Sequence, residues 1–260
     1  MALKPCLSWA QQVQLLRQRG LAVGDPAACE EFLAAQNYYR FSGYARYFQR
    51  APQDGDDMFV QDTSFEGIRR IHDADEELRQ SLSAQLAHAE ILLRSHTAHV
   101  IADRHGPYRS YLSAAFYSDA PSAEPTVEAC LRDIERGDSG SLAGAVASSL
   151  GIAQAGFAYR VRALVYLRNR CAHHSRLWNH SIIDAGPTPN NVRTKAKRLA
   201  GQFDPRSVLD VVASLDDILL RGAGAVAILP SLIIEHSPHE PFWRGLRAPQ
   251  TTHDQHDHIP

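Results

Sequence analysis

The sequence predicts an all-α protein, in which a bundle of helices follows shorter helices at the N-terminus. The first observation is a helical pattern of apolar residues that begins after Thr63 and continues for about forty residues, to His105-Gly106-Pro107. The second is a series of helix start signals, in which a capping residue precedes an apolar helical pattern. The third is the lack of any alternation of apolar and polar residues at strand period. A helix of this length by itself favours a helical bundle.

The composition excludes several classes of protein. The chain has 260 residues with 27 Lys and Arg against 29 Asp and Glu, so any contact with nucleic acid must depend on local patches. The 4 cysteines lie far apart and form no CxxC pair, which indicates neither a zinc site nor a disulfide framework. No apolar stretch reaches about 18 residues, and the N-terminus lacks a leader pattern. We therefore expect a cytoplasmic protein with no metal, no cofactor and no membrane partner.

Two short helices are predicted before residue 37. Ser8 and Gln11 form a capping box for the first helix, and Gly20 ends it. Asp25-Pro26 supplies an N-cap and a first-turn proline for a second helix, which ends near Gln36.

An aromatic segment, residues 37–44 (NYYRFSGY), comes next. Interleaved tyrosines and arginines can stack on bases and bind phosphates, so this segment is a candidate RNA-binding element. The candidate residues are Tyr38, Tyr39, Arg40 and Tyr44. The alternative is that these aromatic rings pack the N-terminal helices onto the main bundle. Residues 51–57 (APQDGDD) then form a polar turn, which is the best candidate for a domain boundary.

The long helix is expected to start at a capping box formed by Thr63 and Glu66. Further along it, Glu90 and Arg94 are four residues apart. They either form an ion pair on one face of the helix or direct the arginine at a neighbouring site. After a loop at residues 118–126, another helix is predicted around residues 127–134.

The C-terminal third combines a loop, a basic cluster and further helices. Residues 184–191 are expected to form an open loop, and the basic cluster after it is either a solvated face or a phosphate-binding rim. The cluster consists of Arg193, Lys195, Lys197 and Arg198. Asp204-Pro205 is expected to start a helix that continues to Gly222, and a short segment around residues 228–234 follows. The end of the chain, residues 247–260, is expected to be disordered.

Residues 164–179 (LVYLRNRCAHHSRLWN) carry the most chemical information. In a helix the apolar residues before Arg168 form one face, and Arg168 falls on the continuation of that face. That face consists of Phe157, Val161, Leu164 and Val165. Since a fully buried arginine is rare unless it is paired, we expect Arg168 at an interface or cleft that meets an anion. Asn169 and His173 are four residues apart and are expected to lie on one flank beside it.

Arg168, Asn169 and His173 are therefore the candidate catalytic residues. A histidine can move a proton to or from a 2′-hydroxyl or a leaving 5′-oxygen, and a guanidinium can hold a phosphate and its developing charge. These residue types suit RNA cleavage without a metal. The alternative is that Arg168 pairs with a buried carboxylate while His173 caps a helix end.

Three segments of the chain resemble the Abi family, the abortive-infection proteins of phage resistance. The spacing from Arg168 to His173 is similar to the Arg-x4-6-His signature of the HEPN ribonucleases, and residues 168–179 resemble the C-terminal hallmark of the bacterial Abi family. The NYYRFSGY segment is similar to a segment near the start of family members, and AEILLRS, with Glu90 and Arg94, is similar to another. The resemblance extends from about residue 4 to residue 243.

The resemblance implies a HEPN-like helical domain at residues 58–246, with an N-terminal helical extension at residues 1–57. In that superfamily two Arg-x4-6-His motifs face each other across a dimer and build one composite site, so a homodimer is implied. The expected function is that of a metal-independent endoribonuclease toxin of phage defence. The alternatives are a non-cleaving RNA-binding or scaffold protein, and a toxin that a separate RNA or protein antitoxin silences.

Overall fold

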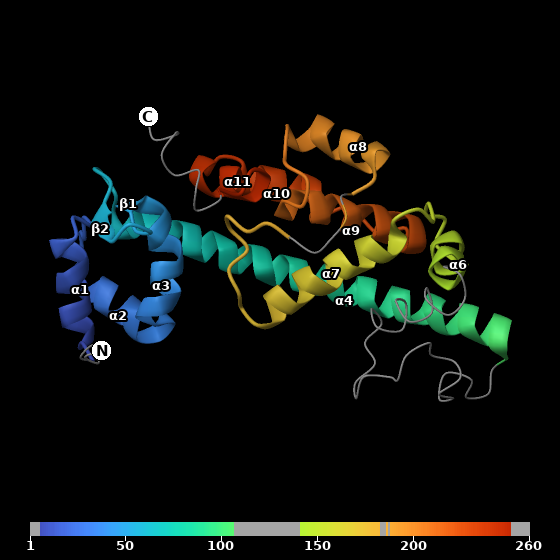
Figure 1. Ribbon diagram of the computed structural model, residues 1–260, viewed down its shortest axis with the longest axis horizontal. Coiled ribbons are helices and arrows are strands. Elements are labelled where there is room, and N and C mark those ends of the chain that lie inside the picture. The colour runs from blue at the N-terminus through green and yellow to red at the C-terminus, as the bar shows by residue number, and fades with distance from the viewer. Residues whose placement is uncertain (1–5, 107–140, 183–185, 187, 251–260) are drawn as a thin grey trace. The chain divides into compact units, whose positions relative to one another are not determined.

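The computed structural model describes residues 6–106, 141–182, 186 and 188–250 (Figure 1). These residues are predominantly helical, with one small two-stranded sheet, which confirms the predicted all-α class. They form two compact units, of which the first ends at Glu77 and the second extends from Leu78 to Pro249. The helix predicted around residues 127–134 and the tail from residue 251 lie outside the described residues. The boundaries predicted after residues 57 and 246 stay predictions.

The first unit contains three short helices whose starts follow the predicted signals. They are α1 (Trp9–Gln18), α2 (Pro26–Gln36) and α3 (Tyr38–Ala45). The capping box of Ser8 and Gln11 is present at the start of α1. The side chain of Asp25 accepts hydrogen bonds from the first backbone N–H groups of α2. Both predicted helix starts are thus confirmed. They can be predicted from the sequence because an N-cap depends on residues only two or three positions apart.

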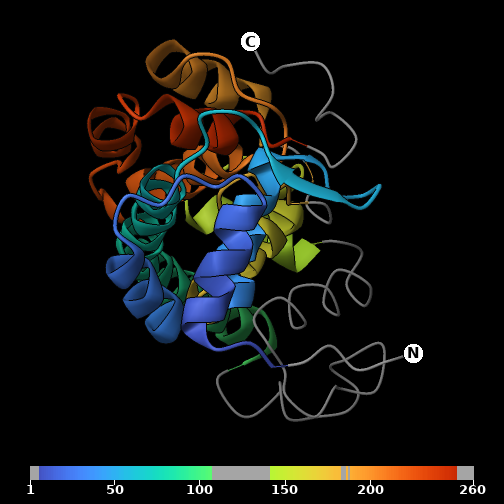
Figure 2. The same ribbon diagram turned by 90° about the vertical axis from the view of Figure 1, so that its left-hand side faces the viewer.

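The first unit also contains a hairpin that the sequence pattern did not predict. A 3-10 turn, η1 (Arg46–Phe48), leads into β1 (Gln49–Ala51), which pairs antiparallel with β2 (Asp56–Phe59). The light-blue arrows in Figure 2 show this hairpin. The predicted polar turn connects the two strands, and Gly55 adopts a φ of 88° within it. Strands of three and four residues are too short to display an alternating pattern, which explains why the sequence shows none here.

Helix α4 (Phe65–His105) has 41 residues and ends where the sequence predicted. Its start differs by one residue. The hydroxyl of Ser64, rather than that of Thr63, accepts the hydrogen bond from the N–H of Gly67 at 3.1 Å. The Thr63 carbonyl accepts a hydrogen bond from the N–H of Ala22, so this residue is held by a contact distant in sequence instead of capping the helix.

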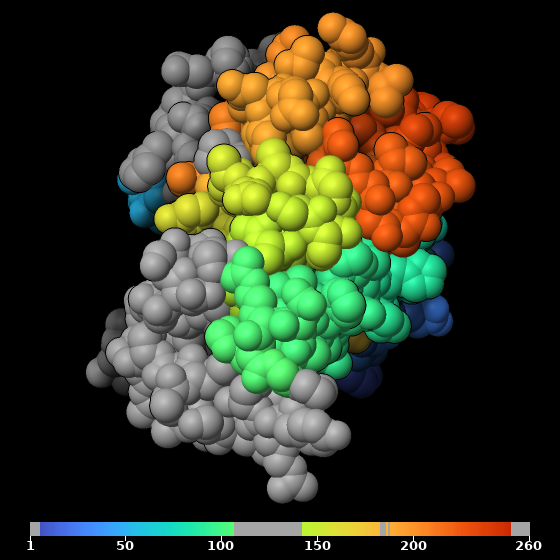
Figure 3. All heavy atoms as spheres, turned by 90° about the vertical axis from the view of Figure 1, so that its right-hand side faces the viewer, coloured from blue at the N-terminus to red at the C-terminus, as the bar shows by residue number. Residues whose placement is uncertain are grey.

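The second unit is a helical bundle around α9. Besides the C-terminal part of α4 it contains α6 (Ser141–Ser149), α7 (Phe157–Ala172), α8 (Asn190–Ala200), α9 (Val208–Ala223), α10 (Leu229–His236) and α11 (Glu240–Arg247). Helix α9 is buried along most of its length and packs against α7, α8, α10 and α11 (Figure 1). On the face drawn in Figure 3, α6 lies beside the last turns of α4, where His96 Nδ1 is 2.8 Å from the hydroxyl of Ser149.

Two boundaries in this unit differ from the predictions. Helix α8 begins at Asn190, inside the segment expected to be a loop. Helix α9 begins at Val208 with Ser207 as its N-cap, after the predicted start at Asp204-Pro205. Arg206 has a φ of 65°, which cannot continue a right-handed helix, so the helix starts only after it. None of the described helices has the length and apolar character needed to cross a lipid bilayer.

Candidate functional site

Helix α7 presents its apolar face to the core, as predicted. Phe157, Val161 and Leu164 are buried, Val165 is only half-buried, and the face continues through Leu167 and Cys171. Arg168 lies at the edge of this face, and its side chain is 51% exposed. Its guanidinium is therefore accessible near the C-terminal end of the helix.

The buried arginine of α7 is a different residue, Arg160, which was not among the predicted site residues. Its side chain is 2% exposed and forms an ion pair with Asp217 of α9 at 2.8 Å. Its Nε also donates a hydrogen bond to the hydroxyl of Ser214 at 2.8 Å. The principle that a buried arginine needs partners thus applies to Arg160 rather than to Arg168.

Glu90 of α4 holds two guanidinium groups together. Its carboxylate oxygens lie 2.5 Å from Nη2 of Arg94 and 3.4 Å from Nε of Arg168. The predicted pair of Glu90 and Arg94 is confirmed, and the same carboxylate also faces the motif arginine. Two positive charges and one negative charge leave this cluster with a net charge of +1. Such a cluster can attract an anion and hold it with guanidinium donors.

Asn169 lies next to this cluster, near the C-terminal end of α7. Arg168 Nη1 donates a hydrogen bond to Oδ1 of Asn169 at 3.3 Å. At about 100° per residue, Asn169 is about 40° from His173 around the helix axis and about 100° from Arg168. Asn169 therefore lies between the two other candidate residues around α7.

His173 is the C-cap of α7, and its N–H donates to the carbonyl oxygen of Asn169 at 2.9 Å. Its side chain is exposed, and within the described part of the chain its ring has no hydrogen-bond partner. His174, the next residue, turns the chain away with a φ of 52°. The alternative explanation, in which Arg168 pairs with a carboxylate and His173 caps a helix end, is thus partly right. His173 does occupy a capping position through its backbone, and Arg168 does face a carboxylate, but both side chains remain accessible.

A second group of side chains, none of them among the predicted site residues, surrounds Tyr166 on the same helix. The Tyr166 hydroxyl is 2.6 Å from Nε2 of His180, and the two rings stack with centroids 5.6 Å apart. The guanidinium of Arg170 lies over the Tyr166 ring and donates to the carbonyl oxygen of Arg176. Burial, with the charges of Arg170 and Arg176, lowers the pKa of His180 to about 4. His180 is therefore neutral at pH 7. The four-residue spacing of Tyr166 and Arg170 was the available signal.

The last residues of the motif segment have a structural role. Trp178 is buried, and its Nε1 donates a hydrogen bond to the carbonyl oxygen of Pro241 at 2.9 Å. The N–H of Asn179 donates to the carbonyl oxygen of Gly245 at 3.2 Å. A Cβ atom on Gly245 would lie 2.2 Å from Nε1 of Trp178. These contacts attach α11 to the segment that follows α7.

Gly245→Ala is expected to destabilise the protein by about 2–3 kcal/mol, because the added methyl group overpacks the contact with the indole. Urea unfolding measures this as a lower midpoint. Gly43→Ala is the matched control, since a Cβ there meets nothing within 4 Å. It lies inside α3, where alanine is favoured over glycine, so its midpoint should be equal or higher. Equal midpoints for Gly245→Ala and the unchanged protein would contradict the described packing.

The structure places the four candidate RNA-binding residues of α3 in different environments. Tyr44 is buried, and its hydroxyl donates to Asp75 at 2.7 Å. Arg40 Nε donates to Nε2 of His72 at 3.3 Å. The Tyr38 hydroxyl accepts a hydrogen bond from the side chain of Arg19, while Tyr39 is 82% exposed. The structure thus makes Tyr44 part of the packing of the first unit, and Tyr39 presents its ring to solvent.

The predicted basic cluster lies on α8. Arg193 is mostly buried and pairs with Asp210 of α9 at 3.0 Å. The ammonium group of Lys197 lies 5.4 Å from the ring centroid of Phe203. Lys195 and Arg198 are exposed. Part of this cluster therefore binds α8 to its neighbours, and part is available to an outside anion.

The described residues contain no group of three or more His, Cys, Asp or Glu side chains arranged to hold a metal ion. The fold and the site define a predominantly helical protein with a cationic cluster and an exposed histidine near the end of one helix. A family model for Abi-like proteins matches residues 31–142 and 135–179, which together make up more than half of the chain. The chain therefore belongs to the Abi-like protein family, and membership associates it with abortive infection, a form of phage defence. No curated protein and no solved structure matches the chain.

Proposed function

We propose that the protein is a HEPN-type, metal-independent endoribonuclease that acts in the cytoplasm in phage defence, with Arg168, Asn169 and His173 at its catalytic site. The observation that carries this proposal is the exposed guanidinium of Arg168, which Glu90 and Asn169 hold near the same helix end as the exposed side chain of His173. A charge of this kind, held in place before the substrate binds, is suited to a phosphate that gains negative charge during reaction.

In the proposed reaction the 2′-hydroxyl oxygen attacks the adjacent phosphorus, and the bond from phosphorus to the 5′-oxygen breaks. The products carry a 2′,3′-cyclic phosphate and a free 5′-hydroxyl. His173 transfers a proton at one of these oxygens. Arg168 holds the non-bridging phosphate oxygens with two donors, and Glu90 positions Arg168.

This chemistry also supports a homodimer. The reaction needs a base at the 2′-oxygen and an acid at the 5′-oxygen, and the candidate set contains one histidine. A second copy of the chain would supply the other proton-transfer group from its own motif. An RNA or protein antitoxin would silence such an enzyme by covering the cationic cluster at Arg168.

The test is to incubate the purified protein with single-stranded RNA in the presence of EDTA. We expect cleavage with 2′,3′-cyclic phosphate ends, because no step uses a metal. A DNA oligonucleotide of the same sequence is the matched control and should stay intact, since it lacks the 2′-hydroxyl. Light scattering of the same preparation should give about twice the chain mass.

Three results would count against parts of the proposal. Loss of cleavage on chelation contradicts the metal-independent mechanism. A strict monomer that still cleaves contradicts the composite site. Tight RNA binding without cleavage would favour the alternative hypothesis, a non-cleaving RNA-binding or scaffold protein.

A further inference from the structure

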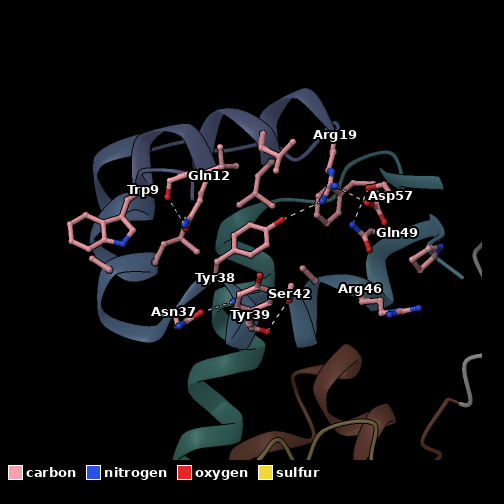
Figure 4. A pocket seen from close by; sticks show the side chains of 18 of the residues that line it. Trp9, Gln12, Arg19, Asn37, Tyr38, Tyr39, Ser42, Arg46, Gln49 and Asp57 are labelled. Carbon is pink, nitrogen blue, oxygen red and sulfur yellow. Dashed lines mark hydrogen bonds and ion pairs between the residues drawn. The ribbon is translucent and has the colours of Figure 1, made fainter. Parts of the chain in front are cut away.

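The first unit contains a cavity that the proposed ribonuclease does not use. Its volume is about 750 Å³, and residues of α1, α2, α3 and the hairpin line it (Figure 4). This volume lies in the range of small-molecule binding sites. All of the lining residues belong to the first unit, whereas Arg168, Asn169 and His173 belong to the second.

Aromatic rings line the cavity and remain accessible. Trp9 is 55% exposed and Tyr39 is 82% exposed, although both are large aromatic side chains. Tyr38 lies between Trp9 and Arg19 in the view of Figure 4. Aromatic faces that are open to solvent at a cavity are suited to stack on a planar ligand.

Gln12 contributes an unsatisfied hydrogen-bond acceptor to the same cavity. Its Nε2 donates to the carbonyl oxygen of Leu7 at 3.1 Å, which orients the amide. Its Oε1 is buried and has no hydrogen-bond partner among the described residues. A buried acceptor without a partner is costly, and an N–H group of a ligand would satisfy it.

The other end of the cavity carries positive charge. Arg19 forms an ion pair with Asp57 at 2.7 Å, whereas Arg46 has no ion pair with any carboxylate in the described ranges. Two arginines and one aspartate leave this end with a net charge of +1. Burial raises the pKa of the Tyr38 hydroxyl, which therefore keeps its proton and can donate it to an anion. Trp9 and Arg19 are at opposite ends of α1, about 15 Å apart along its axis.

We propose that this cavity binds a nucleotide whose base carries an amino group. The base stacks on the aromatic rings at the Trp9 end, and its amino group donates to Oε1 of Gln12. The phosphate lies toward Arg19 and Arg46. The nucleotide is either free or part of a single-stranded RNA, since both present the same base and phosphate. This site goes beyond the proposed ribonuclease activity, because it shares no residue with the catalytic set of Arg168, Asn169 and His173, although it includes Tyr38 and Tyr39 of the candidate RNA-binding segment.

Isothermal titration calorimetry with AMP tests the proposal directly. AMP should bind, and purine riboside 5′-monophosphate, whose base has no N–H group, should bind about tenfold more weakly. Gln12→Leu should weaken AMP binding by about tenfold and make the two nucleotides bind equally. Gln14→Leu is the matched control, because Gln14 is exposed on α1 and does not line the cavity.

A second pair of variants keeps the test valid if Gln12→Leu does not fold. Tyr39→Ala removes an exposed ring from the cavity and should weaken AMP binding by about tenfold. Tyr159→Ala removes an exposed ring of α7 and should leave binding unchanged. Thermal unfolding of each variant checks that it is folded.

A short oligoadenylate distinguishes the two sources of the nucleotide. If AMP binds as tightly as the oligonucleotide, the ligand is a free nucleotide. If the oligonucleotide binds much more tightly than AMP, the ligand is RNA. In both cases Gln12→Leu must weaken the binding. If neither ligand binds, or if the Gln12 and Tyr39 variants bind like their controls, the proposal is overturned. His173→Ala should bind AMP normally, so failure of the ribonuclease proposal and failure of this one are separable.

Discussion

His173→Ala is expected to reduce the rate of RNA cleavage by about a hundredfold or more, the usual effect of losing a general acid or base. RNA binding should be largely retained, because in the proposed mechanism Arg168 holds the phosphate. The fold should tolerate the change, since His173 is exposed and caps α7 with its backbone N–H, which alanine keeps. Single-turnover rates on a labelled RNA oligonucleotide measure the loss.

His174→Ala is the matched control for this experiment. His174 is also exposed, but it follows the helix end with a φ of 52° and is not expected to reach the phosphate. Its cleavage rate should stay close to that of the unchanged protein. Normal cleavage by His173→Ala would show that another group transfers the proton.

Arg168→Ala is expected to lower both RNA binding and cleavage, with a loss of about a hundredfold in the cleavage rate. In the proposed mechanism the guanidinium contacts the phosphate in the bound substrate and holds it more strongly as charge develops, so both quantities should depend on it. Arg168→Lys should recover only part of the rate, because an ammonium group lacks the two-pronged geometry. Binding is measured with a non-cleavable RNA that lacks the reacting 2′-hydroxyl.

Arg94→Ala is the informative comparison, because Arg94 and Arg168 share the carboxylate of Glu90. Removal of Arg94 leaves Glu90 paired with Arg168 alone and lowers the charge of the cluster by one, so we expect a smaller loss than for Arg168→Ala. Equal losses for the two variants would mean that the cluster acts through its total charge, and that Arg168 has no specific role at the phosphate.

The arrangement also separates two roles within the segment that resembles the Abi family. Arg168, Asn169 and His173 lie at an accessible helix end, whereas Trp178 and Asn179 are buried against α11. A similar separation occurs in α3, where Tyr44 is buried and Tyr39 is exposed. One short segment of sequence can therefore contain both accessible side chains and buried packing residues.

The sequence by itself determined the helical class and several helix boundaries. The capping box at Ser8, the cap at Asp25 and the end of α4 at His105 were all predicted correctly. These features depend on interactions within a few residues of the chain, which a sequence displays directly. The cap of α4 was misplaced by one residue because the Thr63 carbonyl pairs with Ala22, a residue far away in the sequence.

Only the tertiary structure decided which arginine of α7 is buried. Arg160 and Arg168 both fall on the apolar face of α7 at helical spacing, so periodicity cannot distinguish them. Ser214 and Asp217 of α9 surround Arg160, while Arg168 meets Glu90 at an exposed edge. The stacking of His180 on Tyr166 and the cavity beside Gln12 were equally invisible in the sequence. Each of these features depends on which element packs opposite a side chain, and helical periodicity carries no information about that partner.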